Sequence, residues 1–449
     1  MPHVRNPRHF AVILALAGVA WPTRADAQDT VTLAEGFRPN HAYKVDVRVQ
    51  LNGKLAVPQG KDKAPQLLPV LGTSKVVYDE RVLEPDEANA QKTVRAYRDV
   101  EFRRMVGTVV QDAVVRPSVR RMVVIRANDR RAPFSPDGPL TWGEIDVVRT
   151  DVFLPATIPG LLPAGPVTTG QKWQVSAAAV AELTDMEKVD EGGLTVEFQG
   201  VAAADGKKLV RMRISGSVRG VNEDGPNRQK LEGTAFFDLD AKLLTYLSVK
   251  GTHELIDGTS GQTTGAIDGH FVMTRTPLAA LPPDLSDTSL RGLALKPDAE
   301  NTLLLYDDQQ LGVRFLYPRG WRVGAVQGKQ VTLDHSRLGG GILITVEPAA
   351  KVPAADDYLR ETTAFLEKER AKVTVTQRPT RIRAEPITVD RFALDVAIGT
   401  ETAKMEYAVL KQTDGGATVA ARLPAATAAD LRTDLERVVR SMSITRRIE

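Results

Sequence analysis

The chain of 449 residues contains no cysteine, which excludes disulfides, thiolate metal ligands and thiol nucleophiles from its chemistry. Its charges nearly balance, with a net charge of +3, so the composition gives no reason to expect nucleic acid or a strongly anionic surface as a partner. After the N-terminal segment no stretch approaches about 18 consecutive apolar residues. The sequence therefore predicts no transmembrane helix in the rest of the chain.

The first 27 residues have the three parts of a secretory signal peptide. Arg5 and Arg8 precede an apolar run at 10–20 (FAVILALAGVA), and the small-residue triplet Ala25-Asp26-Ala27 follows. The run is about half of the roughly 20 residues that a membrane-spanning helix needs, and no cysteine follows it for attachment of a lipid. We expect cleavage after Ala27 and a soluble periplasmic or secreted protein.

The clearest boundary in the remaining chain is a proline-containing stretch at 276–301. It holds four prolines, including the Pro282-Pro283 pair, and shows neither a helical nor a strand period. Such a segment is typical of an interdomain linker. We therefore predict a β-rich domain at 28–275, a linker at 276–301 and a second domain at 302–449.

Alternation of apolar and polar residues dominates the first region. From Tyr43 to Val49 every second residue is apolar, which predicts a half-buried strand, and the stretch 233–249 reads as a hairpin with a polar turn. One helix is expected, at 142–148, where Thr141 and Glu144 have the spacing of a capping box. We predict a mainly β domain built on an open, strongly curved antiparallel sheet or partial barrel.

The second region mixes strands and helices. Strands are expected from 312 to 347 and again from 373 to 423, separated by a helix that starts near Pro353 and ends near Ala371. The spacing of apolar residues between Leu431 and Met442 predicts an amphipathic final helix, with Thr427 as its cap. The predicted class is α+β, an antiparallel sheet packed with two helices.

Few residues suggest acid–base or metal chemistry. His253 and His270 fall on adjacent predicted strands and could meet across a sheet, but no third metal ligand is indicated. Ser260 lies in a glycine- and threonine-rich turn without a partner base, and the glycines at 339–341 lead into a strand rather than a phosphate-binding helix. We assign no catalytic, metal or cofactor-binding residue and expect no cofactor.

The segment from Arg95 to Arg131 is locally basic, with ten arginines against four acidic residues. Three arginine doublets occur in it, Arg103-Arg104, Arg120-Arg121 and Arg130-Arg131. One interpretation is a site for an anionic partner such as lipid headgroups or an acidic polymer. The other, which we favour, is the solvated face of strands whose core side is apolar.

Two resemblances can be stated from short motifs. The stretch Val313-Arg314-Phe315-Leu316-Tyr317-Pro318-Arg319-Gly320-Trp321 resembles the opening of the PsbP/Mog1/DcrB-like α+β sandwich, which implies such a fold at 303–449 and a role in binding rather than catalysis.

The N-terminal region resembles uncharacterised exported β proteins at 140–146 (LTWGEID), 160–163 (GLLP) and 167–173 (VTTGQKW). Its expected open curved sheet is also similar in architecture to the half-barrel of the LolA/LppX lipid carriers, although architecture alone does not give function.

Three functions remain open from the sequence. The first is a non-catalytic exported protein that binds another protein or an envelope component. The second is a periplasmic carrier of lipid or another hydrophobic ligand, which requires a concave sheet face that is apolar and unfilled. The third is a hydrolase without a recognisable motif, for which His253, His270, Asp238 and Glu254 would be the first residues to test.

Overall fold

The computed structural model describes residues 30–57, 65–86, 89–127, 130–149, 160–204, 206–222, 225–384 and 387–448. The predicted signal peptide at 1–27 lies outside these residues. Within them the protein is mostly β, with long antiparallel strands and five helices. The predicted class, mainly β plus α+β, is confirmed.

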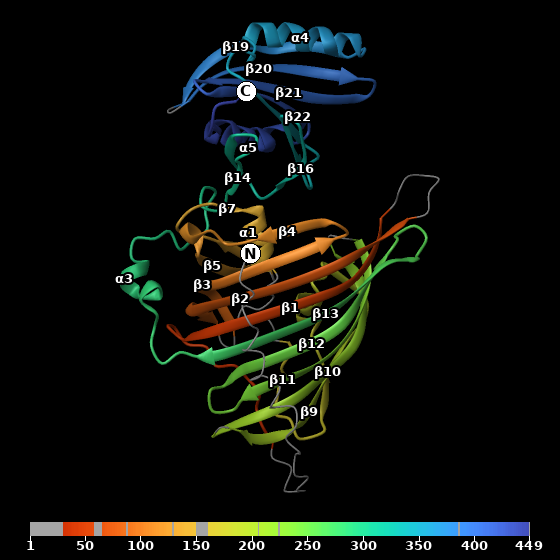
Figure 1. Cartoon of the computed structure of the whole chain (residues 1–449), viewed down its shortest axis with the longest axis vertical. Coiled ribbons are helices and arrows are strands. Elements are labelled where there is room, and N and C mark those ends of the chain that lie inside the picture. The colour runs from red at the N-terminus through yellow and green to blue at the C-terminus, as the bar shows by residue number, and fades with distance from the viewer. Residues whose placement is uncertain are drawn as a thin grey trace, which may run out of the picture.

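Twelve strands form one open antiparallel sheet that curves strongly (Figure 1). Their order is β6-β5-β3-β2-β1-β13-β12-β11-β10-β9-β8, with β4 paired to β3. The bounds are β1 Ala42–Val57, β2 Gln66–Asp86, β3 Asn89–Val106, β4 Val109–Ala113, β5 Arg121–Ala127, β6 Arg130–Phe134, β8 Lys172–Gln174, β9 Lys188–Ala204, β10 Lys207–Asn222, β11 Gly225–Asp238, β12 Leu243–Ile256 and β13 Thr263–Pro277.

Alternation along β1 defines the two faces of this sheet. Tyr43, Val45 and Val47 are fully buried, whereas Lys44 and Arg48 are exposed. Because successive side chains of a strand point to opposite faces, the residues paired with the buried three share their face. We call it the inner face, and it carries the continuous hydrophobic core of this part of the chain. The opposite, outer face is mainly polar.

Helix α1 (Trp142–Arg149) begins with the predicted capping box. The Thr141 hydroxyl accepts a hydrogen bond from the Glu144 amide at 3.2 Å, and the Glu144 carboxylate accepts one from the Thr141 amide at 2.8 Å. Both bonds satisfy backbone amides that the first helical turn leaves without partners. The predicted helix at 142–148 is confirmed.

A second helix in this region was not expected. Helix α2 (Ala177–Thr184) is capped by Ser176, whose hydroxyl accepts from the Ala179 amide at 3.2 Å. It packs on the inner face near β9, and Gln229 on β11 donates to the Thr184 carbonyl at 2.8 Å. The prediction of a single helix was wrong because this eight-residue, alanine-rich segment is too short to show a clear period.

The predicted linker is attached to the large sheet. It contains the 3₁₀ turn η3 (Pro283–Leu285) and the short helix α3 (Asp287–Leu290). Leu285 and Leu290 are buried in a separate small cluster with Val94 and Ala96 of β3. We call residues 283–290 the docked linker.

The C-terminal part is built on a seven-stranded antiparallel sheet of order β16-β17-β18-β22-β21-β20-β19. Its elements are β16 Trp321–Gln327, β17 Gln330–His335, β18 Gly341–Glu347, α4 Ala355–Lys368, β19 Lys372–Ala384, β20 Ile387–Ile398, β21 Glu401–Gln412, β22 Gly415–Pro424 and α5 Ala428–Ser441. The two helices cover opposite faces of the sheet (Figure 1). The predicted sheet with two packed helices is confirmed.

Two helix ends differ from the prediction. Helix α4 ends at Lys368 rather than near Ala371, because Arg370 adopts a left-handed φ of 64° that terminates the helix. Thr427 is the N-cap residue of α5, but its hydroxyl donates to the Leu338 carbonyl at 3.3 Å and makes no capping bond.

A small sheet connects the first region to the second. Strand β7 (Leu140–Thr141) pairs in parallel with β14 (Leu304–Asp308), which continues to β15 (Val313–Tyr317) and β23 (Ser443–Ile444). Arg319 donates to the Thr302 carbonyl at 2.9 Å and to the Pro133 carbonyl. One hydrophobic cluster includes buried residues from both regions.

Candidate functional site

The structure does not bring together the four residues considered for hydrolysis. His253 pairs with Ile267 on the inner face, whereas His270 is on the outer face and lies 3.0 Å from the Ser248 hydroxyl. Asp238 caps the β11–β12 turn by accepting from backbone amides, and Glu254 is paired with Arg228 on the outer face. Their separation on two faces of one sheet leaves no common point for a substrate.

The other motif candidates occupy turns. The Ser260 hydroxyl donates to Asp257 at 2.8 Å in the β12–β13 loop, where Asp257 also accepts from two backbone amides. These bonds hold the pKa of Asp257 below its ordinary value. The glycines at 339–341 lead from the β17–β18 connection into β18, whose first residue is Gly341, and a Cβ at Gly340 would lie 2.7 Å from Leu431. Both segments thus form strand connections, as predicted.

Most arginines of the basic segment are matched by local partners. Arg95 is buried and bonded to Glu80 at 3.1 Å, Arg104 donates to Gln111, and Arg116 is paired with Glu144 at 2.8 Å. Burial by itself raises the pKa of Glu144, but the bonds from Arg116 and the two backbone amides outweigh it and hold that pKa below its ordinary value. Side chains of the Arg130-Arg131 doublet lie outside the described residues.

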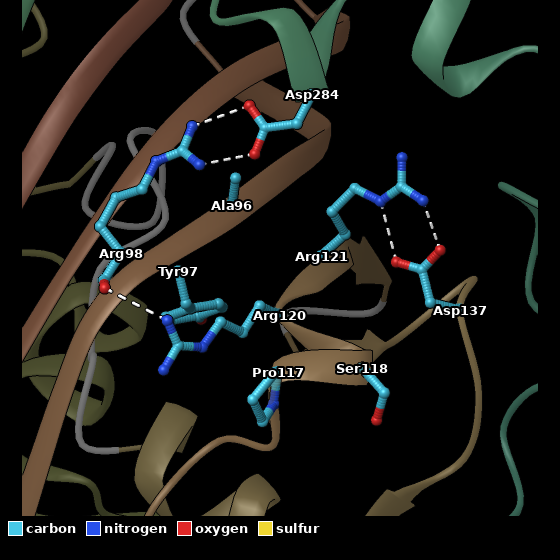
Figure 2. Close-up of a pocket in the computed structure, with 9 residues that line it drawn as sticks. All are labelled: Ala96, Tyr97, Arg98, Pro117, Ser118, Arg120, Arg121, Asp137 and Asp284. Carbon is cyan, nitrogen blue, oxygen red and sulfur yellow. Dashed lines mark hydrogen bonds and ion pairs between the residues drawn. The ribbon is translucent and has the colours of Figure 1, made fainter.

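A pocket of about 460 Å³ lies where β3, the 3₁₀ turn η2 (Pro117–Val119), β5 and the docked linker meet (Figure 2). Arg98 binds Asp284 through two hydrogen bonds, of 2.6 and 2.8 Å, and Arg121 binds Asp137. Arg120 is exposed, and in Figure 2 its side chain extends toward the backbone of Arg98, away from the Arg121–Asp137 pair. Its guanidinium donates to the Arg98 carbonyl at 3.4 Å and has no carboxylate partner among the described residues.

One end of the inner face is mainly apolar and only half covered, with His253 among its half-buried side chains. Beyond the buried core, the strands continue with half-buried side chains, of which Val49, Leu231 and Phe271 border the core. We call this set the inner apolar surface, and it consists of Val49, Leu51, Leu55, Leu231, Leu255, Ile267 and Phe271. Four of its members belong to none of the core clusters: Leu51, Leu55, Leu255 and Ile267.

Glycines of the neighbouring strands lie opposite the leucines of β1. Leu51 pairs with Gly72 on one side and Gly269 on the other, and Leu55 pairs with Gly265. A Cβ at Gly265 would lie 2.7 Å from the Leu55 side chain, so the glycine leaves room for the leucine to lie across the sheet. A Cβ at Gly269 would lie 3.4 Å from Leu51, which is an ordinary contact.

A buried polar cluster lies on the same inner face at the other end of the strands. Glu35 is paired with Arg275, and Arg275 lies over the Tyr43 ring at 5.4 Å. Burial raises the pKa of Glu35 and raises the pKa of Tyr43 well above its ordinary value. The cluster pairs within itself inside the core, so we assign it to packing and not to ligand binding.

Among the described residues, no three histidine, aspartate or glutamate side chains lie close enough together to hold a metal ion. No helix in the described part of the chain is long and apolar enough to span a membrane.

No family model matches the chain, and no curated protein matches it. Among solved structures, cyanobacterial PsbP from Synechocystis sp. PCC 6803 is 16% identical and covers 32% of this chain and 92% of its own, with a TM-score of 0.27. DynF from the dynemicin biosynthesis pathway of Micromonospora chersina is 10% identical over 60% of this chain and 94% of its own, with a TM-score of 0.13. The translocator domain of the autotransporter NalP from Neisseria meningitidis is 9% identical over 86% of this chain and 88% of its own, with a TM-score of 0.12.

At a TM-score of 0.27 the match to PsbP carries no argument, and the PsbP-like region stays a prediction from the sequence. At such TM-scores none of the three carries an argument about function. The likeness to LolA/LppX half-barrels stays a prediction from architecture.

Sequence reasoning missed both surfaces. The pocket needs Asp284, which is 186 residues from Arg98 and lies in a segment predicted to be a free linker. The inner apolar surface needs the register of β1 against β13, strands that are far apart in the sequence. A signal was present in Gly265 and Gly269, which are four residues apart on one face of β13, opposite Leu55 and Leu51 of β1.

Proposed function

We propose that the protein is a non-catalytic binding protein whose inner apolar surface holds an elongated hydrophobic ligand, such as the acyl chain of a lipid. The observation that carries the proposal is the set of half-buried leucine and isoleucine side chains on the inner face that belong to no core cluster. Apolar side chains left partly open opposite glycines of the neighbouring strands suit an apolar ligand better than water.

The dimensions of the inner apolar surface and the free energy gained by burial on it both suit a single acyl chain. Leu51 and Leu55 are about 13 Å apart along β1, and the surface crosses four strands, or about 14 Å. Burying about eight methylene groups at about 0.8 kcal/mol each gives about 6 kcal/mol. That corresponds to a Kd in the range of tens of micromolar.

One arginine lies at the side of this surface. Arg104 on β3 pairs with Gly72, which pairs with Leu51, so the three share the inner face. Its exposed guanidinium donates to Gln111 at 2.7 Å. An acidic headgroup on the ligand would exchange this neutral partner for a charge-assisted bond. The proposal therefore favours an acyl chain with a carboxylate or phosphate headgroup over a neutral lipid.

The test is the binding of a fluorescent fatty acid to the purified protein. We expect saturable binding that Gly269→Leu weakens about tenfold or more, because the new side chain fills the inner apolar surface without a backbone clash. Ala266→Leu is the matched control, since Ala266 is exposed on the outer face of the same strand. No saturable binding by the unaltered protein, or equal weakening by both variants, would contradict the proposal.

Binding to another protein is the second candidate. It is supported by exposed apolar side chains at one corner of the large sheet, Leu67 at 64%, Leu71 at 46%, Val109 at 62% and Val110 at 44% exposed. Strand β4 pairs only with β3 among the described residues, so its other edge is free to pair with a strand of a partner. For either candidate, we also propose that the protein acts after export, because a signal peptide is predicted at 1–27.

A further inference from the structure

The pocket beside the docked linker is a second surface, separate from the inner apolar surface. Ala96 is buried against the docked linker, and Arg121 pairs with Ala96 across β3 and β5. The inner apolar surface instead begins at Val49 and Leu51 of β1. A ligand in the pocket would therefore touch none of the residues proposed above to hold an acyl chain.

Each charged side chain that lines the pocket, with one exception, is paired with a side chain of opposite charge. Arg98 is bonded to Asp79 at 2.8 Å and to Asp284, and Arg121 to Asp137. Arg120 lines the same pocket with one long hydrogen bond to a backbone carbonyl and no carboxylate partner among the described residues. A guanidinium has five donor hydrogens, so Arg120 has most of its hydrogen-bonding capacity open to a ligand.

The Arg98–Asp284 pair shows how an oxyanion would be bound. Two parallel bonds of 2.6 and 2.8 Å join the guanidinium to the carboxylate, the geometry that arginine uses for carboxylates and phosphates. Both side chains are more than a third exposed, at 38% and 39%. Exposed pairs of this kind hold weakly, so a ligand that carries more charge can take the place of Asp284.

We propose that this pocket binds a small oxyanion, the phosphate or carboxylate groups of a soluble ligand, between Arg120 and Arg98. The ligand accepts hydrogen bonds from Arg120 and from the face of Arg98 that Asp284 occupies. Ser118 also lines the pocket, but in Figure 2 its hydroxyl points away from both arginines, so the ligand is held by the two guanidinium groups. Because Leu285 and Leu290 keep the docked linker in place, the Asp284 side chain can turn away while the backbone stays attached.

Isothermal titration of the full-length protein with inorganic pyrophosphate and, separately, with citrate tests this proposal at constant ionic strength. We expect saturable binding of at least one probe, and the tighter of the two identifies phosphate or carboxylate as the preferred group. Arg120→Gln should weaken binding about tenfold or more, because a charge-assisted bond is lost. Arg219→Gln, at an exposed arginine of β10, is the matched control and should bind as the unaltered protein does.

Asp284→Asn should change the affinity for the oxyanion in the opposite direction. Removing the competing carboxylate should tighten binding several-fold while Arg120→Gln weakens it, a combination that general loss of folding does not produce. Absence of saturable heat with both probes, Arg120→Gln binding as tightly as the unaltered protein, or unchanged affinity in Asp284→Asn would each overturn the proposal. Fatty-acid binding should be unaffected by all three variants, so failure here is distinguishable from failure of the proposed function.

Discussion

Glu144 is one of several charged side chains in the described part of the chain that are almost completely enclosed. Its side chain is 2% exposed, and it accepts hydrogen bonds from the Arg116 side chain, the Arg116 amide and the Thr141 amide. Most other ion pairs are on the outer surface, for example Arg228 with Glu254, where solvent weakens the attraction. A single enclosed carboxylate therefore joins the start of α1 to the segment that follows β4.

Replacing this carboxylate should destabilise the protein in a pH-dependent way. Glu144→Gln is expected to lower the free energy of unfolding by about 1–3 kcal/mol near neutral pH, because charge-assisted bonds are lost in a buried site. The folded pKa of Glu144 is depressed, so its contribution is present above the unfolded value and is lost as the pH falls through the folded pKa. Denaturant unfolding near pH 7 and near pH 3 should show a difference that narrows in acid. Glu361→Gln, at an exposed position of α4, should change little at either pH, and a pH-independent effect of Glu144→Gln would contradict the assignment.

Among the elements of the fold, the docked linker is the segment whose packing against the sheet cannot be predicted from the sequence. Leu285 is completely buried and Leu290 nearly so, yet they are five residues apart and show no helical or strand period. Their partners, Val94 and Ala96, lie in a strand far away in the sequence. A proline pair followed by a four-residue helix thus looks like free chain until its tertiary contacts are known.

Truncating Leu285 should release this segment. Leu285→Ala removes a fully buried side chain and should cost about 2–5 kcal/mol locally. Amide hydrogen exchange is expected to rise across 283–290 and much less in β10 or β22. Leu67→Ala, at a position that is 64% exposed, serves as the control and should leave exchange unchanged. If amide exchange at 283–290 were the same in both variants, the burial of Leu285 would not be what attaches the docked linker to the sheet.

The elements that were predicted correctly have strong local signals. Helix α1 has both members of its capping box within four residues, and α5 has an apolar stripe over more than two turns. Helix α2 and the docked linker were missed because their stability comes from contacts with strands far along the chain. The candidate surfaces were missed for the same reason, since each depends on strand register or on a residue from a distant segment.

At the scale of the whole molecule, the first and second regions share structure. Leu140 pairs with Leu304 across β7 and β14, and Arg319 bonds to the carbonyls of Thr302 and Pro133. Burial lowers the pKa of Arg319 from its ordinary value. The two regions on either side of the boundary predicted at 276–301 are therefore in contact with each other.

This sharing predicts cooperative unfolding. We expect one calorimetric transition for the unaltered protein, with calorimetric and van't Hoff enthalpies in agreement. Arg319→Ala removes one bond between the regions, the one to the Pro133 carbonyl, and should broaden or split the transition. Arg378→Ala, at an exposed position of β19, is the control. Two resolved transitions in the unaltered protein would show that the regions unfold independently.

Photolabelling would show whether a hydrophobic chain lies on the inner apolar surface. A fatty acid with a photoreactive group on its chain would be bound to the full-length protein, activated by light and located by peptide mass spectrometry. We predict labels on Leu51, Leu255 and Ile267, reduced in Gly269→Leu and unchanged in Ala266→Leu. Labels confined to the exposed corner at Leu67 and Val109, or no labelling above that of a protein without fatty-acid affinity, would contradict the proposed function.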